Sequence, residues 1–337
     1  SSIIKNDVQC FGESNGVIDL IVEGGTEPYE YLWSNGETTE DISNLEIGTY
    51  QVTISDFHGC ETTNSVEITE PDELIISIDN ITNVSCFGFN NGSATVNVTG
   101  GTPPYYYEWS NGINSQNITE LVAGNYSLTV TDAHNCIAEI SCEITEPSEI
   151  VIDYSIEDVL CFGESNGAID ISPVGGVTPY TYLWSNGAIS EDIDNLTAGS
   201  YIVTITDLNN CEHSWEFTVN QPDTLSLDFS NNHICFGETS GEIDLIVSGG
   251  TLPYSYQWSN GAITEDITDL SAETYYVTVI DGNNCSIIGS TEIIEAASPF
   301  TTNIYVEDVL CNGDNTGSIS VDVSGSIAPY QFLWSNG

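Results

Sequence analysis

Positive charge is almost absent from this sequence. Its 337 residues include one basic residue, Lys5, against 51 Asp and Glu, so the formal net charge is −50 at pH 7. Nucleic acids and anionic membranes are bound through basic surface, and this charge balance argues against both as partners. The same charge predicts a soluble, self-repelling surface and is compatible with binding of divalent cations.

Long apolar runs and helical periodicity are also missing. No stretch is apolar over the length that a membrane-spanning helix needs, so we expect no membrane insertion. No signal peptide precedes the first repeated segment, and we interpret the chain as a section of a longer protein that carries its export and anchoring signals elsewhere. Strong acidity often accompanies disorder. Here hydrophobic residues make up 40% of the chain and form regular patterns, which predicts a folded protein.

No set of catalytic residues stands out. No Ser-His-Asp or Cys-His arrangement recurs around the His residues, and Gly pairs such as Gly24-Gly25 stand between strands rather than before a helix. We therefore expect no enzyme activity. The four His residues are His58, His134, His213 and His233.

What the chain does have is a repeat. The segment PYEYLWSNG at Pro28 to Gly36 is followed by four further copies of the pattern PYxxxWSNG, at a step of 74 to 76 residues. Such a period predicts a tandem array of one small domain. We expect repeat 1 at residues 1–70, repeat 2 at 71–146, repeat 3 at 147–221, repeat 4 at 222–298, and the first half of repeat 5 at 299–337.

The repeated segment has the pattern of a β-strand with one buried face. Tyr29, Tyr31 and Trp33 alternate with Glu30 and Leu32, and aromatic residues suit a strand that faces a core. The alternative is an exposed aromatic platform that stacks on sugar rings, which would make the array a carbohydrate-binding one. We predict that the Trp of each copy is a core residue: Trp33, Trp109, Trp184, Trp258 and Trp334.

Short alternating segments and turn residues continue through each repeat. About seven strands with turn signals every 8 to 12 residues predict an all-β, immunoglobulin-like antiparallel sandwich of about 75 residues. Tyr126 stands two residues after Gly124, as in the tyrosine corner of such sandwiches. The segments expected to be extended in repeat 2 are Leu74 to Ile81, Ser93 to Val98, Tyr105 to Trp109, Tyr126 to Thr131 and Cys136 to Ile144. Ile113 to Ile118 is expected to be either a short, polar strand or a loop.

Eight of the ten cysteines form four pairs with a spacing of 50 residues. One pair per small domain predicts an intra-repeat disulfide and an oxidising compartment. A bridge across the junction, from Cys60 to Cys86, is the alternative. Cys311 would find its partner beyond this sequence, and Cys142, in an alternating apolar segment, is expected to be a buried free thiol. The predicted pairs are Cys10 with Cys60, Cys86 with Cys136, Cys161 with Cys211, and Cys235 with Cys285.

Acidic residues recur at two fixed places. One Asp stands four residues before the second cysteine of each repeat, and another follows a Glu in three of the repeats. Backbone hydrogen bonding in a β-turn is the favoured role of the first, and calcium binding is the alternative. We assign no cofactor. The residues are Asp56, Asp132, Asp207 and Asp281 for the first place, and Asp41, Asp192 and Asp266 for the second.

The junctions between repeats are short. Segments such as Thr69-Glu70-Pro71 lead from the last strand of one repeat into the first strand of the next, with no flexible Gly/Ser linker. Because Pro restricts the backbone dihedral angles of its own residue and of the residue before it, we expect a semi-rigid, end-to-end array.

The combined motif resembles the SprB repeat, and its closing strand also resembles that of PKD-type sandwiches. The matching residues include Cys161-Phe162-Gly163, Asn166-Gly167, Gly175-Gly176, Pro179 to Gly187 and Leu196 to Cys211. The resemblance implies a very large cell-surface adhesin of Bacteroidota that is exported by type IX secretion, in some cases for gliding motility.

We therefore expect a non-catalytic, extracellular stalk whose neighbours are repeats of the same chain. The adhesive ligand, a surface or a polysaccharide, would bind outside this region. Lateral self-association of neighbouring stalks is a further interaction that the sequence allows.

Overall fold

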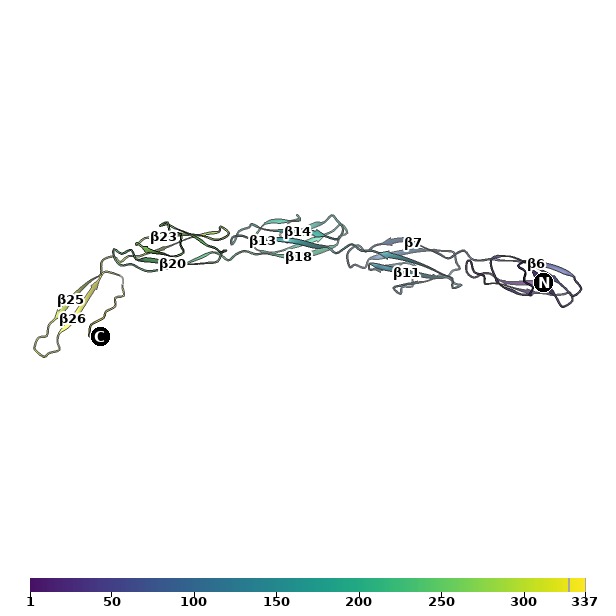
Figure 1. Cartoon of the computed structure of the whole chain (residues 1–337), viewed down its shortest axis with the longest axis horizontal. Helices are drawn as coiled ribbons and strands as arrows, with labels where there is room; N and C mark the ends of the chain where they lie inside the picture. The colour runs from purple at the N-terminus through teal and green to yellow at the C-terminus, as the bar shows by residue number, and fades with distance from the viewer. Residues whose placement is uncertain (327, 337) are drawn as a thin grey trace. The chain divides into compact units, whose positions relative to one another are not determined.

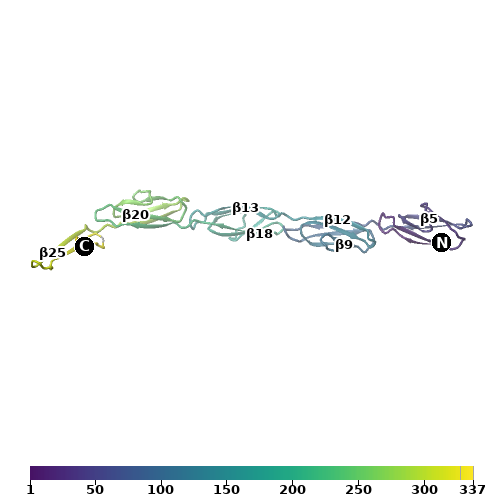
Figure 2. The ribbon, with the colours of Figure 1, turned by 60° about the horizontal axis from the view of Figure 1, so that its bottom comes forward.

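The computed structural model describes residues 1–326 and 328–336, and its regular structure consists of β-strands. None of the described residues belongs to a helix that is long and apolar enough to cross a membrane. The chain divides into two compact units, each described by itself. The first contains residues 1–151, 174–180 and 206–212, and the second contains 152–173, 181–205 and 213–337. Figures 1 and 2 trace the strands in chain order by colour.

Repeat 2 shows the architecture of one complete unit. It has two three-stranded sheets with the strand orders β10-β8-β7 and β12-β11-β9, and the pairs are antiparallel. This confirms the predicted all-β sandwich, with six strands in place of about seven. The strands are β7 (Ile75–Thr82), β8 (Gly92–Thr99), β9 (Tyr106–Trp109), β10 (Ile118–Leu121), β11 (Gly124–Thr131) and β12 (Ile137–Ile144).

The segment Ile113 to Ile118 is a loop up to its last residue, where β10 begins. A tight turn ends β9, because the Gly112 amide donates to the Trp109 carbonyl and the Trp109 amide donates to the Ile113 carbonyl. The residues after this turn cross from the sheet of β9 to the sheet of β10. Only Ile118, the last residue of the segment, therefore pairs with a neighbouring strand.

Repeats 1, 3 and 4 follow the same strand order. Repeat 1 has β1 (Ser2–Asn6), β2 (Gly16–Ile21), β3 (Glu30–Trp33), β4 (Ile42–Leu45), β5 (Gly48–Ser55) and β6 (Glu61–Ile68). Repeat 3 has β13 (Val151–Glu157), β14 (Gly167–Val174), β15 (Thr181–Trp184), β16 (Ile193–Leu196), β17 (Gly199–Thr206) and β18 (Glu212–Val219). Repeat 4 has β19 (Ser226–Asn231), β20 (Gly241–Ser248), β21 (Ser255–Trp258), β22 (Ile267–Leu270), β23 (Thr274–Ile280) and β24 (Ser286–Glu292), and repeat 5 has β25 (Thr301–Glu307) and β26 (Ser318–Ser324).

The core lies between the two sheets of each repeat. In repeat 2, Trp109 is 2% exposed and packs with alternate residues of β11, such as Leu128 and Val130, which are fully buried. Its indole N–H is satisfied by the Ser115 carbonyl at 3.0 Å. The equivalent Trp33, Trp184 and Trp258 are also 2% exposed. These four indoles are therefore core residues and cannot take part in an exposed stacking platform.

Trp334 differs from the other four. It is 43% exposed, so the prediction of a core residue is wrong for this copy. The described part of repeat 5 contains one two-stranded sheet, β25-β26, and no opposing sheet covers the indole there.

The predicted tyrosine corner is confirmed. The Tyr126 hydroxyl donates to the Val122 carbonyl four residues upstream at 3.0 Å. This bond satisfies a buried phenol and fixes the turn that enters the long strand β11. The same bond recurs from Tyr50 to Glu46, from Tyr201 to Thr197 and from Tyr275 to Ser271.

Replacing Trp109 by Ala tests the core assignment. We expect a loss of about 3–5 kcal/mol in the free energy of unfolding of repeat 2, since the change empties a fully packed site. Urea unfolding followed by circular dichroism measures it. Tyr106→Ala, on the same strand but 64% exposed, is the matched control and should cost under about 1 kcal/mol. Equal losses in the two variants would contradict the assignment.

Candidate functional site

The disulfides join neighbouring repeats. Cys10 pairs with Cys136, Cys86 with Cys211 and Cys161 with Cys285, at sequence separations of 126, 125 and 124 residues. The predicted intra-repeat pairs, Cys10–Cys60 and its three equivalents, are therefore wrong. The alternative Cys60–Cys86 bridge is also wrong, although it correctly placed the disulfide between two neighbouring repeats.

We call the first cysteine of each repeat the loop cysteine and the second the turn cysteine. The loop cysteines are Cys10, Cys86, Cys161, Cys235 and Cys311, and the turn cysteines are Cys60, Cys136, Cys211 and Cys285. Each disulfide links the loop cysteine of one repeat to the turn cysteine of the next.

Strand length explains why the two cysteines of one repeat do not meet. In repeat 1, Cys60 immediately precedes β6, whereas the loop that contains Cys10 is attached beyond the other end of β6 by the Val8 amide, which donates to the Thr69 carbonyl. An eight-residue strand is roughly 26 Å long. A disulfide allows its Cα atoms to lie only about 4.4–6.8 Å apart. The intra-repeat pair is therefore out of reach.

The junction residues hold the loop cysteine in place. The Glu70 carboxylate accepts a hydrogen bond from the Gly12 amide at 2.8 Å, and Asn15 accepts one from the Gln9 amide at 3.0 Å. Gly12 has φ +75°, a conformation that favours Gly. Glu146 and Gln221 hold Gly88 and Gly163 in the same way at 2.7 and 2.9 Å, and Glu295 holds Gly237. This role is not among the predictions from the sequence, although the position recurs as Glu or Gln before the first strand.

An Asp carboxylate shapes the turn on the other side of the bridge. One oxygen of Asp132 accepts from the amides of His134 and Cys136 at 2.8 and 2.9 Å, and the other accepts from the Thr102 amide at 2.8 Å. The hydrogen-bonding hypothesis is thus confirmed, and the bond to Cys136 orients the turn cysteine. Asp56, Asp207 and Asp281 each accept the three equivalent bonds.

These bonds favour the charged form of the carboxyl group. Burial raises the pKa of Asp132, but the amides of Thr102, Cys136 and His134 together outweigh it and hold the pKa below its ordinary value. For Asp56, the hydrogen bond from the Cys60 amide is the largest cause of a lowered pKa.

The second set of recurring acids also serves the backbone. Asp41 accepts from the Leu20 amide at 3.0 Å, and Asp192 and Asp266 accept from Ile171 and Leu245 at 2.9 Å. Asn117 does the same for Val96 at 3.1 Å in repeat 2. An amide oxygen replaces a carboxylate oxygen here, so hydrogen-bond acceptance is what the position needs.

Close contacts surround each bridge. The sulfur of Cys136 lies 3.4 Å from the Gln9 carbonyl, and that of Cys211 lies 3.3 Å from the Ser85 carbonyl. Asn209 donates to the same Ser85 carbonyl at 2.9 Å, and Asn283 donates to Leu160 at 2.9 Å. The equivalent residue beside the bridge of repeat 2 is His134, whereas His58 of repeat 1 stands near the unpaired Cys60.

Four cysteines are unpaired. Cys60, Cys235 and Cys311 are exposed, whereas Cys142 is buried. Burial raises the pKa of the Cys142 thiol, which keeps it protonated and unreactive at neutral pH. The turn at Cys60 forms without a bridge, because Asp56 accepts from the Cys60 amide at 2.9 Å.

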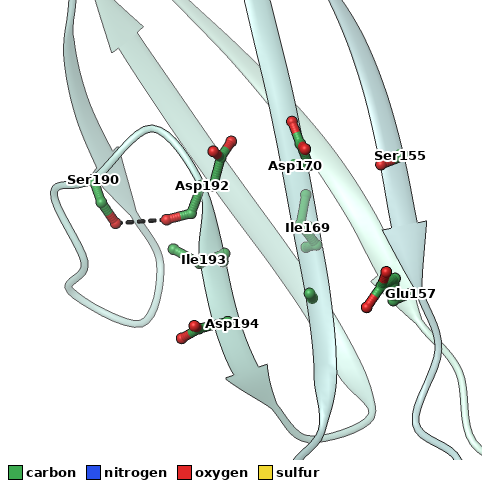
Figure 3. A pocket seen from close by; sticks show the side chains of 9 residues that line it. Ser155, Glu157, Ile169, Asp170, Ser190, Asp192, Ile193 and Asp194 are labelled. Atoms are coloured by element: carbon green, nitrogen blue, oxygen red, sulfur yellow. Dashed lines mark hydrogen bonds between the residues drawn. The ribbon is translucent and has the colours of Figure 1, made fainter.

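A hollow of about 450 Å³ on repeat 3 is the other acidic feature (Figure 3). Glu157, Asp170 and Asp194 line it, and the Ser190 hydroxyl donates to the Asp192 carbonyl at 2.6 Å. The labelled carboxylates do not converge on one point (Figure 3). Over residues 1–326 and 328–336, no three His, Cys, Asp or Glu side chains are grouped so that they could hold a metal ion.

Tandem β-sandwiches joined by disulfides across their junctions define a multi-repeat structural array. The family model of the SprB repeat matches five times, at residues 2–38, 78–114, 154–189, 228–263 and 303–337. The chain belongs to the SprB-repeat family, as its motifs predicted. No curated protein sequence matches it.

Two solved structures illustrate what the chain is similar to. The Sidekick-1 immunoglobulin domains 1-5 are 12% identical over 83% of this chain and 76% of their own, with a TM-score of 0.31. A tetra-tandem repeat in the extending region of a large adhesion protein is 12% identical over 83% of this chain and 95% of its own, also with a TM-score of 0.31.

Peptide mapping without reduction tests the disulfide pairing. We expect linked peptides that contain Cys10 with Cys136, Cys86 with Cys211 and Cys161 with Cys285. Because the chain has one basic residue, the digestion needs a protease that cleaves at acidic or aromatic residues. Recovery of Cys10 linked to Cys60 would contradict the pairing. A reduced and alkylated sample, in which every linked mass disappears, is the control.

Replacing Asp132 by Asn tests the turn. At neutral pH we expect a loss of about 1–3 kcal/mol in unfolding free energy, since one amide donor loses its charged acceptor. The pKa of the Asp132 carboxyl is lower in the folded state than in the unfolded state, where it is near 4. The charged carboxylate therefore stabilises the fold above about pH 4, and this stabilisation is lost as the pH falls through the folded pKa. The difference between the parent and Asp132→Asn should therefore shrink below about pH 4.

Urea unfolding at several pH values measures that difference. Asp79→Asn is the matched control, because Asp79 lies exposed on β7 of the same repeat. A difference between the parent and Asp132→Asn that stays constant down to low pH would contradict the role of the charged carboxylate.

Proposed function

We propose that this chain is a non-catalytic stalk segment of a large secreted cell-surface adhesin. One observation carries the proposal: three consecutive junctions are each closed by a disulfide between successive repeats. Separate binding modules need no covalent link beyond the backbone. A segment that transmits load between its ends does gain from such links, because a covalent bridge survives when the fold around it opens.

The proposed location follows from the same bonds. Disulfides persist in oxidising environments and are rare where thiols are kept reduced, so they support an extracellular array. Membership of the SprB-repeat family supports a cell-surface adhesin. Export by type IX secretion and a part in gliding motility extend this proposal through the resemblance of the motifs.

The surface of the chain favours a spacer over a ligand-binding array. The aromatic strands of the four complete repeats bury their indoles, which argues against a polysaccharide platform built on these Trp residues. With a net charge of −50, stalks of this kind repel one another, which opposes lateral association. The adhesive ligand is then bound by another part of the parent protein.

A competition experiment tests the proposal. Cells of the source organism are allowed to attach to a surface in the presence of the purified, oxidised chain. A stalk segment should leave attachment unchanged at any concentration, while antibodies raised against the chain should label intact cells. Inhibition of attachment by the chain would contradict the stalk assignment and indicate a ligand-binding array. Absence of surface labelling would contradict the location.

A further inference from the structure

The three disulfide loops overlap along the sequence. The first closes residues 10–136, the second residues 86–211, and the third residues 161–285. Each loop begins before the preceding one ends. Every residue from Cys10 to Cys285 therefore lies within at least one closed covalent loop. This property depends on connectivity alone and holds for any arrangement of the two units.

Overlap decides how far the chain can be stretched. Tension between the two ends follows the shortest covalent path, which crosses from Cys10 to Cys136, follows the chain to Cys161, and crosses to Cys285. That path contains about 86 residues and reaches roughly 300 Å at full extension, whereas the 337 residues without bridges reach roughly 1,150 Å.

We propose that the inter-repeat disulfides make this chain a length-limited tether, in which tension passes through the sulfur bridges and bypasses most of each of repeats 1 to 4. This function goes beyond the stalk assignment, because a spacer with one closed loop per repeat could still be drawn out between its loops. It also stands independently of the adhesive role of the parent protein.

The residues under tension are few and belong to known elements. Between Cys136 and Cys161 they are β12, the junction at Glu146-Pro147, and β13. β12 pairs with β11 over its whole length, from Gly124 opposite Ile144 to Thr131 opposite Ile137. The strands that carry Trp109 and most of the core of repeat 2 lie inside the first loop and outside the load path.

The second disulfide provides a reserve route. While the first and third bridges are intact, the Cys86–Cys211 bond is not on the shortest path. If Cys10 loses its bond, tension instead crosses from Cys86 to Cys211, returns to Cys161, and crosses to Cys285. This path contains about 187 residues, or roughly 650 Å. Loss of one bridge thus lengthens the chain without releasing it fully.

Single-molecule pulling tests the proposal on the full chain held by its two termini. The background carries Cys60→Ser, Cys235→Ser and Cys311→Ser, which removes the exposed free thiols. We expect a maximum length of roughly 300 Å when oxidised and roughly 1,150 Å after reduction. Adding Cys10→Ser should about double the oxidised length. Adding Cys86→Ser, the matched control, should leave it unchanged.

The rival pairing predicts different lengths. This rival pairing is tested in the chain with its native cysteines. If each repeat contained its own closed loop, the shortest covalent path between the termini would contain about 136 residues and reach roughly 480 Å. In that case Cys86→Ser would add about 50 residues, or roughly 170 Å. Either result would overturn the proposal. The fully extended length counts covalent links whether or not a variant is folded, so a destabilised variant still gives a clear answer.

Discussion

The closing strand of each complete repeat, seven or eight residues long, is the constraint on which the array depends. It places the turn cysteine before one end and the junction after the other, as β6 does between Cys60 and Thr69. Because the loop cysteine is hydrogen-bonded near that junction, its nearest possible partner belongs to the following repeat. The Asp132 turn then presents Cys136 from the near end of repeat 2. The length of the closing strand thus keeps the two cysteines of one repeat apart, so that each pairs with a cysteine of a neighbouring repeat.

The charge of the chain favours such a link. Lys5 is the one basic residue of the chain, and its ammonium group is already bonded to Asp7 at 2.8 Å. Ion pairs between repeats are therefore unavailable, and neighbouring repeats carry charge of the same sign. Two like charges 10 Å apart in water repel by roughly 0.4 kcal/mol, and many such pairs act at once. Salt screens this repulsion only over about a Debye length. The covalent bridge holds repeats together at any ionic strength.

Local pattern in the sequence was enough to predict the sandwich, the buried Trp109 and the corner bond of Tyr126, because each of these depends on residues close together in the chain. The disulfide pairing depends on which end of the domain each cysteine occupies. A uniform spacing of 50 residues says nothing about that. The signal was present in the strand order: Cys86 follows the first strand and Cys136 precedes the last. These two strands finish at the same end of the repeat, where the Val84 amide donates to the Thr145 carbonyl, so the two cysteines lie at opposite ends. The holding role of Glu70 could not be predicted, because it depends on a loop that is brought back to the junction.

The bridges also change what a single repeat contributes to stability. A repeat with two three-stranded sheets is small for an independent domain. Closing a loop of about 125 residues stabilises the folded state by up to about 4–5 kcal/mol in the chain-entropy account. That contribution is shared, because each loop contains parts of two repeats and overlaps the next loop. Unfolding of repeat 2 therefore takes place inside loops closed through repeats 1 and 3. The repeat is the unit of sequence and of core packing, whereas the unit of covalent closure is a pair of repeats.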